Sequence, residues 1–335
     1  MGRGGPRTGP GSSIARERRP ATRMRLFLLG KAGSVNHWLE EATASLIAEG
    51  HAVRTGFVRR SWLAQGLEAR LAAPIAAGLT RRLRHERFDL ILVIGALHAP
   101  HALLEAVARL EGRPPLAGWA GDLFEAEAAE RAALFDLIAY TDTALVARHQ
   151  ALGFSAPTLF LPHAADVSGV WPSRRHRSPD LVFVGNATPH RRAVVAGTAS
   201  PLVLVGAGWS EADGAHHHRR ARRMAPDAVR ALYGGHGAVL NIRNEANVLA
   251  GLNQRNFAPL MAGAALLTDD QPDLDHCFEP GVEVLVWRDL AELNAQAERL
   301  RGDPDLARRL GERGRRRVLA EHTYGRRLQT LAAAL

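Results

Sequence analysis

The stretch that decides the fold is residues 252–293, LNQRNFAPLMAGAALLTDDQPDLDHCFEPGVEVLVWRDLAEL. Its pattern predicts a polar loop, an apolar helix at residues 256–262, a glycine turn and a buried strand at residues 264–268. An Asp-rich loop, a second strand at residues 282–287 and a helix capped by Asp289 follow. Alternation of this kind is typical of an open α/β sheet.

Polar residues precede the helix of this stretch. In an open α/β sheet, ligands bind beyond the carboxyl ends of the strands, where helix N-termini offer unpaired N–H groups to an anion. The residues expected at this place are Asn253, Gln254, Arg255 and Asn256. The sequence therefore predicts a ligand site here.

The length and composition predict two domains without a membrane span. A chain of 335 residues exceeds the usual size of one hydrophobic core, and an apolar fraction of 46% suffices for two. No apolar run is long enough for a transmembrane helix, and the start lacks the apolar core of a signal peptide. Cys277 is the only cysteine, which excludes an internal disulfide and a cysteine-based metal site and fits a cytoplasmic location.

The net charge of +9 is concentrated at the start of the chain. Residues 1–23 carry a net charge of +5, which leaves +4 for the remainder. This leader is rich in Gly, Pro and Ser and is expected to be disordered, or to lie upstream of a true start at Met24. A basic arm that grips RNA or lipid headgroups is the alternative, and it leaves peripheral membrane contact open. The chain has no recognised nucleic-acid module, so no nucleic-acid partner is expected.

The first half, residues 24–166, has the pattern of a Rossmann-like domain. It opens with a short strand, a glycine loop and an amphipathic helix, and an apolar run at residues 89–95 is typical of a strand buried on both faces. The glycine loop completes neither a dinucleotide fingerprint nor a Walker A motif, and a plain strand-to-helix turn remains an alternative. Lys31 in this loop is the only lysine of the chain. The candidate site residues of the loop are Gly30, Lys31, Gly33 and Ser34.

Two residues that follow strands of this half are candidates for catalysis. Asp122 could act as a general base on an acceptor hydroxyl, or it could cap a helix at Ala126. His163 follows a strand near the crossover to the second half. It is a candidate catalyst, although a structural hydrogen-bonding role is the alternative.

The second half repeats the strand, glycine and helix-start order. After an irregular linker at residues 167–178, the domain covers residues 179–320, and a terminal helix covers residues 321–335. Gly185 and Asn186 follow its first strand, and Arg191 lies in the helix after them. Asn241 ends a later strand at the same expected edge. The run HHHRRARR, residues 216–223, is expected to be an exposed loop and not a zinc site.

Four segments carry a resemblance to a known family. They are NQRNF, GAALLTDD, FEPGVEVLVWRDLAEL and, near the C-terminus, GRRRVLAEHTYGRRL. Together they resemble the C-terminal half of the group 1 glycosyltransferases, most closely the spore-maturation (CgeB-like) subgroup. The resemblance implies the glycosyltransferase B fold, two Rossmann-like domains facing across a cleft. It further implies that the second domain holds a nucleotide-sugar and that the terminal helix braces the first domain.

The resemblance also implies a function and a set of site residues. The chain is expected to move a sugar from a nucleotide diphosphate-sugar donor to an unidentified sugar, lipid or protein acceptor. Arg255 and Arg191 would bind the diphosphate, without a metal or other cofactor, and Asp122 or His163 would activate the acceptor. The full set of expected donor-binding residues is Gly185, Asn186, Arg191, Asn241, Asn253, Arg255 and Asn256.

The chain departs from the family pattern at two positions. Ala258 stands where the family has a Glu that binds the donor's ribose hydroxyls, and Ala250 stands where its partner Glu is usual. A hydrogen bond to a charged group contributes about 1.5–3 kcal/mol, so the loss is expected to weaken donor binding. A non-catalytic sugar-nucleotide binder or partner subunit is therefore the alternative function.

Overall fold

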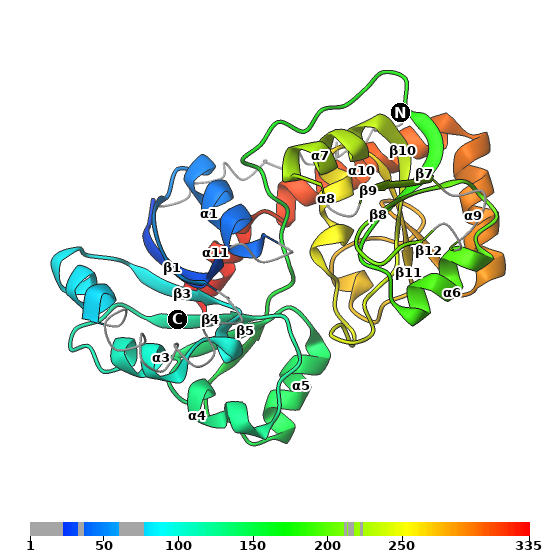
Figure 1. Cartoon of the computed structure of the whole chain (residues 1–335). Coiled ribbons are helices and arrows are strands. Elements are labelled where there is room, and N and C mark those ends of the chain that lie inside the picture. The colour runs from blue at the N-terminus through cyan, green and yellow to red at the C-terminus, as the bar shows by residue number, and fades with distance from the viewer. Residues whose placement is uncertain (1–22, 33–36, 60–76, 211–212, 214–217, 222–223) are drawn as a thin grey trace, which may run out of the picture.

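The computed structural model describes the chain apart from residues 1–22, 33–36, 60–76, 211–212, 214–217 and 222–223. It contains two α/β domains, each built on a six-stranded parallel sheet, which lie side by side in Figure 1. This is the two-domain α/β fold that the sequence predicts.

The sheet of the first domain has the strand order β2-β1-β3-β4-β5-β6. Its central strands are apolar along their whole length and buried on both faces, as expected for a parallel sheet covered by helices. The strands are β1 (Arg25–Ala32), β2 (Ala52–Arg59), β3 (Leu90–Ile94), β4 (Leu116–Ala120), β5 (Leu137–Tyr140) and β6 (Thr158–Phe160). The helices are α1 (Trp38–Ala48), η1 (Ala96–His98), α3 (His101–Ala108), η2 (Ala126–Ala128), α4 (Ala129–Ala132) and α5 (Thr143–Ala151), and residues 77–85 are also helical.

The sheet of the second domain has the strand order β12-β11-β10-β7-β8-β9. Its direction of winding reverses between β7 and β10, which is where ligands bind in sheets of this type. The strands are β7 (Ser178–Val184), β8 (Leu202–Val205), β9 (His218–Ala221), β10 (His236–Asn241), β11 (Ala265–Asp269) and β12 (Leu285–Trp287). The helices are α6 (Pro189–Gly197), α7 (Pro226–Gly235), η3 (Gln254–Asn256), α8 (Ala258–Met261), η4 (Leu274–His276), α9 (Leu290–Gly302) and α10 (Pro304–Glu321).

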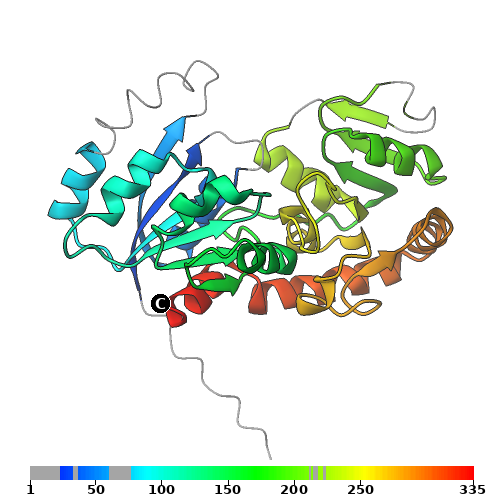
Figure 2. The same ribbon diagram turned by 90° about the horizontal axis from the view of Figure 1, so that it is seen from below.

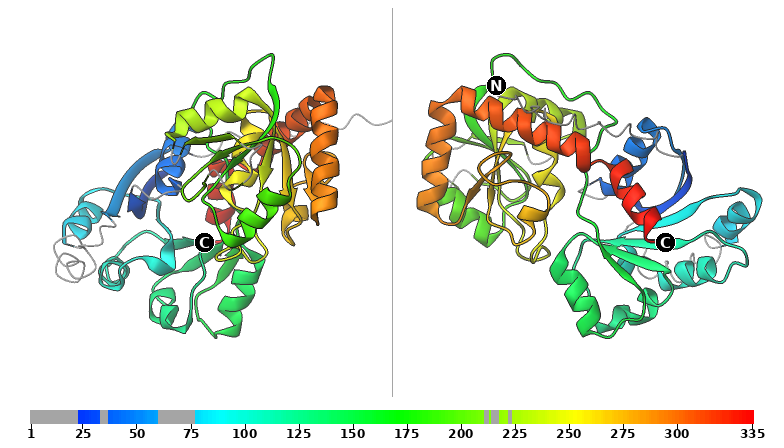
Figure 3. Two further views of the ribbon diagram at one scale, coloured as in Figure 1. Left: turned by 45° about the vertical axis from the view of Figure 1, so that its right-hand side comes forward. Right: turned by 180° about the vertical axis from the view of Figure 1, so that it is seen from behind.

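The last helix, α11 (Tyr324–Ala333), returns to the first domain. Figures 2 and 3 show α10 and α11 running from the second domain to the first. The carboxylate of Glu49, at the end of α1, accepts hydrogen bonds from Thr323 Oγ1 at 2.6 Å and Gly325 N at 2.7 Å. Because a helix N-terminus has unpaired N–H groups and a positive dipole end, this carboxylate fixes α11 on α1.

A second junction joins the N-terminus of α5 to the second domain. Asp142 caps α5 through Ala144 N and also accepts hydrogen bonds from Leu249 N and Ala250 N, both at 2.9 Å. In return, Asp273 of the second domain accepts hydrogen bonds from Thr143 N at 2.8 Å and from its hydroxyl. Both carboxylates are 2% exposed. The two domains therefore share one buried, fully hydrogen-bonded contact.

The structure corrects several local expectations. The helix expected at residues 256–262 divides into η3 and the short α8, and β12 begins at Leu285 rather than at residue 282. Residues 218–221, expected in an exposed loop, pair with β8 as the edge strand β9. The cap of α9 by Asp289 is confirmed by its acceptance of a hydrogen bond from Glu292 N.

Helix α10 packs so closely against the residues before β11 that position 311 has no room for a side chain. A Cβ atom at Gly311 would lie 2.1 Å from the backbone oxygen of Gly263, which cannot rotate away. We expect Gly311→Ala to lower the free energy of unfolding by about 1–3 kcal/mol. Thermal unfolding measures this loss. Gly302→Ala, at the end of α9 with no atom within 4 Å of the added Cβ, is the matched control. Equal midpoints for the two variants would contradict the prediction.

Candidate active site

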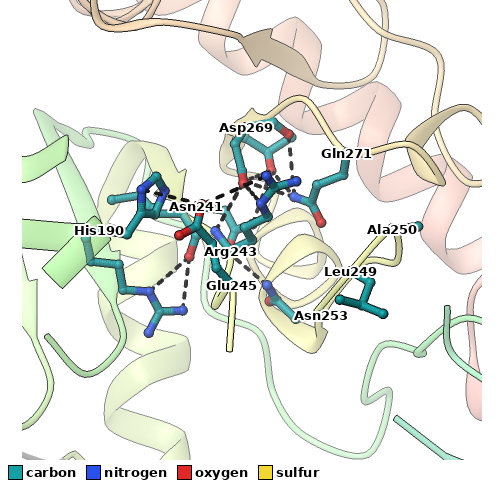
Figure 4. Close-up of polar contacts among 12 residues, drawn as sticks. His190, Asn241, Arg243, Glu245, Leu249, Ala250, Asn253, Asp269 and Gln271 are labelled. Carbon is teal, nitrogen blue, oxygen red and sulfur yellow. Dashed lines mark hydrogen bonds and ion pairs between the residues drawn. The ribbon is translucent and has the colours of Figure 1, made fainter. Parts of the chain in front are cut away.

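The carboxyl edge of the second sheet gathers polar side chains at the point where the winding reverses. Gly185 and Asn186 follow β7 there, while Ile242 and Arg243 follow the adjacent β10. Figure 4 shows the polar contacts at this edge. The predicted donor-binding residues of the second domain lie at or beneath this edge.

Arg191 joins the loops that follow β7 and β10. Its guanidinium donates from Nε and Nη2 to Ile242 O, at 3.2 and 3.0 Å, and from Nη1 to Asn186 O at 3.0 Å. The side chain is 3% exposed, and burial, followed by the charge of Arg255, lowers its pKa to about 9. The sequence predicts that Arg191 binds a diphosphate. In the structure most of its donors bind backbone carbonyls, so Arg191 holds the loops after β7 and β10 together.

Amide side chains support the edge from beneath. Asn256 is fully buried, and Asn241 is 1% exposed. Asn256 Oδ1 accepts from Asn253 N at 3.0 Å, while both buried amides donate to Thr268 Oγ1. Asn253 and Asn256 thereby form a capping box at the start of η3. The sequence predicts that Asn241 and Asn256 bind the donor; in the structure both side chains are buried beneath the edge.

Charged groups that the sequence analysis did not select occupy the rim of this edge. Asp269, at the end of β11, lies with its carboxylate 3.7 Å from Arg243 Nε and accepts from Arg243 N. Glu245 lies 3.6 Å from His190 Nδ1 and 4.0 Å from Arg243 Nη2. Burial raises the pKa of Asp269, and the hydrogen bond and charge of Arg243 oppose this. Its position directly after a buried strand is the sequence signal that could have identified Asp269.

Arg255 carries a positive charge without a hydrogen-bond partner. Its backbone N–H donates to Asn253 Oδ1 at 2.8 Å, which fixes the residue in η3. Among the described residues, no group accepts a hydrogen bond from its guanidinium, and its Nε is buried. Burial lowers its pKa, while Tyr233 and Asp269 act in the opposite direction. A buried donor without a partner is unfavourable, so Arg255 is suited to bind an anion.

His163 lies in the first domain within the electrostatic reach of Arg255. Its ring contacts Trp38, with 4.5 Å between ring centroids, and neither ring nitrogen has a hydrogen-bond partner among the described residues. Burial, then the charges of Arg327 and Arg255, lowers the pKa of His163 to about 3. The imidazole is therefore neutral at physiological pH.

Asp122 lies at an exposed part of the junction. Its Oδ1 accepts a hydrogen bond from Asn247 Nδ2 of the second domain at 3.2 Å. The alternative role as a helix cap is wrong, because the N-cap of η2 is Glu125 and no side chain caps it.

The glycine loop of the first domain is only partly described. Gly30 lies in β1, where a Cβ would be 3.3 Å from Ile94 O. Lys31 is also in β1, but its side chain is outside the described part, as are Gly33 and Ser34 entirely. Their proposed contact with a ligand stays a prediction.

Glu41 is a site candidate that the sequence analysis missed. It projects from α1, and its Oε2 accepts a hydrogen bond from Gln254 Nε2 of the second domain at 3.1 Å. Burial raises the pKa of Glu41 to about 8, and Asp166 and Glu40 add to this rise while Arg230 opposes it. A single Glu on an amphipathic helix gives no sequence signal that it meets another domain.

The structure bears on two further expectations. Among the residues described, no group of three or more His, Cys, Asp or Glu side chains is arranged to hold a metal ion. No helix in the described part of the chain is long and apolar enough to cross a membrane.

The raised pKa of Glu41 predicts a pH-dependent stability. The pKa is 4.5 in the unfolded reference and about 8 in the folded protein, so the folded state keeps a proton that the unfolded state has lost. Stability is therefore lost as the pH rises through this window. Glu41→Gln removes this titration. We therefore expect the variant to gain stability relative to the wild type when the pH is raised from 5 to 9, as measured by the difference between their midpoints of thermal unfolding. A difference that does not change with pH would refute the assignment.

The contacts of Arg191 predict that its shape matters more than its charge. Arg191→Ala leaves buried carbonyl groups without donors, which costs about 1–3 kcal/mol for each group. Lysine keeps the charge but lacks the fork that reaches both loops. We expect Arg191→Lys to lose most of the stability that Arg191→Ala loses, as measured by denaturant unfolding. Full stability of the lysine variant would show that charge alone suffices.

Comparison with known proteins concerns the fold and the sequence pattern of the second half. Residues 182–333 match the family model described as glycosyl transferase-like. A search of curated proteins gives no match. Among solved structures, a sucrose-phosphate synthase from Thermosynechococcus elongatus has a TM-score of 0.65 at 13% identity, covering 93% of this chain and 98% of that one.

Two further solved structures have the same fold. A glycosyltransferase from Rickettsia africae has a TM-score of 0.65 at 10% identity, covering 93% of this chain and 98% of that one. Anabaena HepE in complex with UDP and glucose has a TM-score of 0.62 at 13% identity, covering 93% of this chain and 99% of that one. The whole described chain thus has the glycosyltransferase B fold, and its second domain has the sequence pattern of a glycosyl transferase-like family.

Proposed function

We propose that the protein is a glycosyltransferase that moves a sugar from a nucleoside diphosphate-sugar to a hydroxyl or amine acceptor. The spore-maturation subgroup and a cytoplasmic site of action belong to this proposal. The observation that carries it is the guanidinium of Arg255, which lies at a helix start beside the point where the second sheet reverses its winding and has no acceptor among the described residues. The complexes of HepE with UDP and with UDP-glucose support a uridine nucleotide as the first donor to test.

Arg255 would bind the diphosphate and stabilise it as it leaves. Hydrogen-bond donors that are already in place when charge develops on a leaving group lower the barrier, and an arginine can do this without a metal. Gly185 and Asn186 would face the pyrophosphate from the loop after β7. This loop is held in place because Asn186 Oδ1 accepts from Ala207 N at 3.0 Å and Asn186 O accepts from Arg191.

His163 and Asp122 are the proposed groups on the acceptor side. A neutral imidazole with both nitrogens unpartnered can donate one hydrogen bond and accept another, which suits binding of a hydroxyl group. Asp122 would contact the acceptor only at the exposed part of the junction, where Asn247 already binds it.

A binding protein without turnover is the second candidate, and Ala258 favours it. This residue packs beside the apolar cluster that contains Leu232 and Tyr233, and Ala250 is buried against Asp142. Neither position therefore offers a carboxylate to a donor. Turnover separates the candidates, because only a transferase or a donor hydrolase releases the nucleoside diphosphate from the sugar conjugate.

We expect a nucleoside diphosphate to stabilise the wild type and Arg255→Gln to weaken its binding by at least about tenfold. UDP, GDP, ADP and TDP, each with its common sugar conjugates, are added singly in thermal unfolding. A ligand at about one hundred times its Kd adds roughly 2.7 kcal/mol, enough to move the midpoint by several degrees. The matched control is Arg175→Gln in the exposed linker, near the start of β7 and thus at the other edge of the sheet. No midpoint shift with any nucleotide would contradict the proposed function.

A further inference from the structure

Glu41 is the carboxyl group that the first domain presents to the segment carrying Arg255. Its hydrogen bond with Gln254 joins α1 to η3, so the carboxyl lies next to the residue that precedes Arg255 in the chain. The protonation that its raised pKa implies at neutral pH gives the carboxyl both a donor and an acceptor oxygen.

A tyrosine hydroxyl shares the amide of Gln254 with Glu41. The Tyr324 hydroxyl is 3.4 Å from Gln254 Nε2. Tyr233, on α7, is 2% exposed, yet its hydroxyl has no hydrogen-bond partner among the described residues. Tyr233 belongs to the apolar cluster against which Ala258 packs, and Ala258 lies three residues after Arg255.

Arg255 lies between this group and the edge where the winding reverses. In η3 it stands between Asn256, whose amide donates to Thr268 beneath this edge, and Gln254, whose amide donates to Glu41. The ring of His163 contacts Trp38, which lies three residues before Glu41 on α1. A diphosphate on Arg255, with its nucleoside toward the edge, therefore directs its sugar toward Glu41, Tyr233 and His163.

The unpartnered groups fit a neutral, polyhydroxylated ligand. Each sugar hydroxyl donates one hydrogen bond and accepts others, so it needs partners of mixed character, and carboxyl, phenol and imidazole groups provide this. On the second domain, Ala250 and Ala258 offer no polar side chain.

We propose that Glu41, together with Tyr233 and His163, binds the hydroxyl groups of the transferred sugar. The sugar would thus be recognised by a carboxyl from the first domain, while the nucleotide is held by the second. This inference rests on the proposed function, because it takes Arg255 as the diphosphate site.

Calorimetric titration of the full chain with UDP and with UDP-glucose tests the inference. GDP and GDP-mannose replace this pair if guanine gives the larger thermal shift. We expect Glu41→Gln and Tyr233→Phe each to weaken binding of the sugar conjugate by about tenfold and to leave binding of the nucleoside diphosphate within about twofold. Glutamine keeps an oxygen that can accept from Gln254, so the junction is preserved.

The matched control is Glu130→Gln on α4, an exposed carboxylate of the same domain, which should change neither affinity. Equal weakening of both ligands by Glu41→Gln would mean that Glu41 acts only on the domain junction and would overturn the inference. An unchanged affinity for the conjugate would overturn it as well. If the wild type binds no nucleoside diphosphate, the proposed function fails first, and the inference fails with it.

Discussion

The buried contact of Asp142 and Asp273 with the N-terminus of α5 is the constraint on which the site depends. Two carboxylates that are 2% exposed are costly to bury, and each accepts hydrogen bonds from N–H or hydroxyl groups of the facing domain. Gly251 makes this contact possible, since a Cβ there would lie 2.6 Å from Thr141 O. Neither domain alone supplies all the hydrogen-bond donors that these two carboxylates bind. Folding of the segment before η3 is therefore coupled to docking of the domains.

The position of Arg255 follows from this junction. Asp142 fixes the backbone at Leu249 and Ala250, and the capping box of Asn253 and Asn256 then shapes η3. Within the described part of the chain, the guanidinium of Arg255 in η3 then has no hydrogen-bond acceptor. The return of α10 and α11, anchored by Glu49, provides a second and separate connection between the domains.

The fold was largely predictable from the sequence, and the site only in part. Apolar runs such as residues 90–94 and glycine turns have strong local signals, and the helix at residue 290 has a cap that is read directly. Within the described residues, the guanidinium of Arg255 has no acceptor and can bind an anion as predicted. The guanidinium of Arg191, in contrast, is hydrogen-bonded to backbone carbonyls, and Asn256 is buried. Those differences depend on which carbonyls and amides meet between distant strands, and a single sequence does not contain that information. Glu41 was missed for the same reason, because its partner lies 213 residues away.

The proposed donor site has no counterpart to the carboxylate pair of the glycosyltransferases that the chain resembles, and the distribution of charge bears on this difference. Arg191 keeps its charge at neutral pH because its pKa is about 9, while burial keeps Glu41 largely protonated and His163 neutral. The environment around Arg255 is thus positive before any ligand binds, which favours an anion such as a diphosphate. A glutamate at Ala258 would have to be buried beside Leu232 and Tyr233, where desolvation is unfavourable, and it would also offset part of this positive charge. The proposed recognition of sugar hydroxyls by the protonated carboxyl of Glu41 in the first domain would avoid both costs.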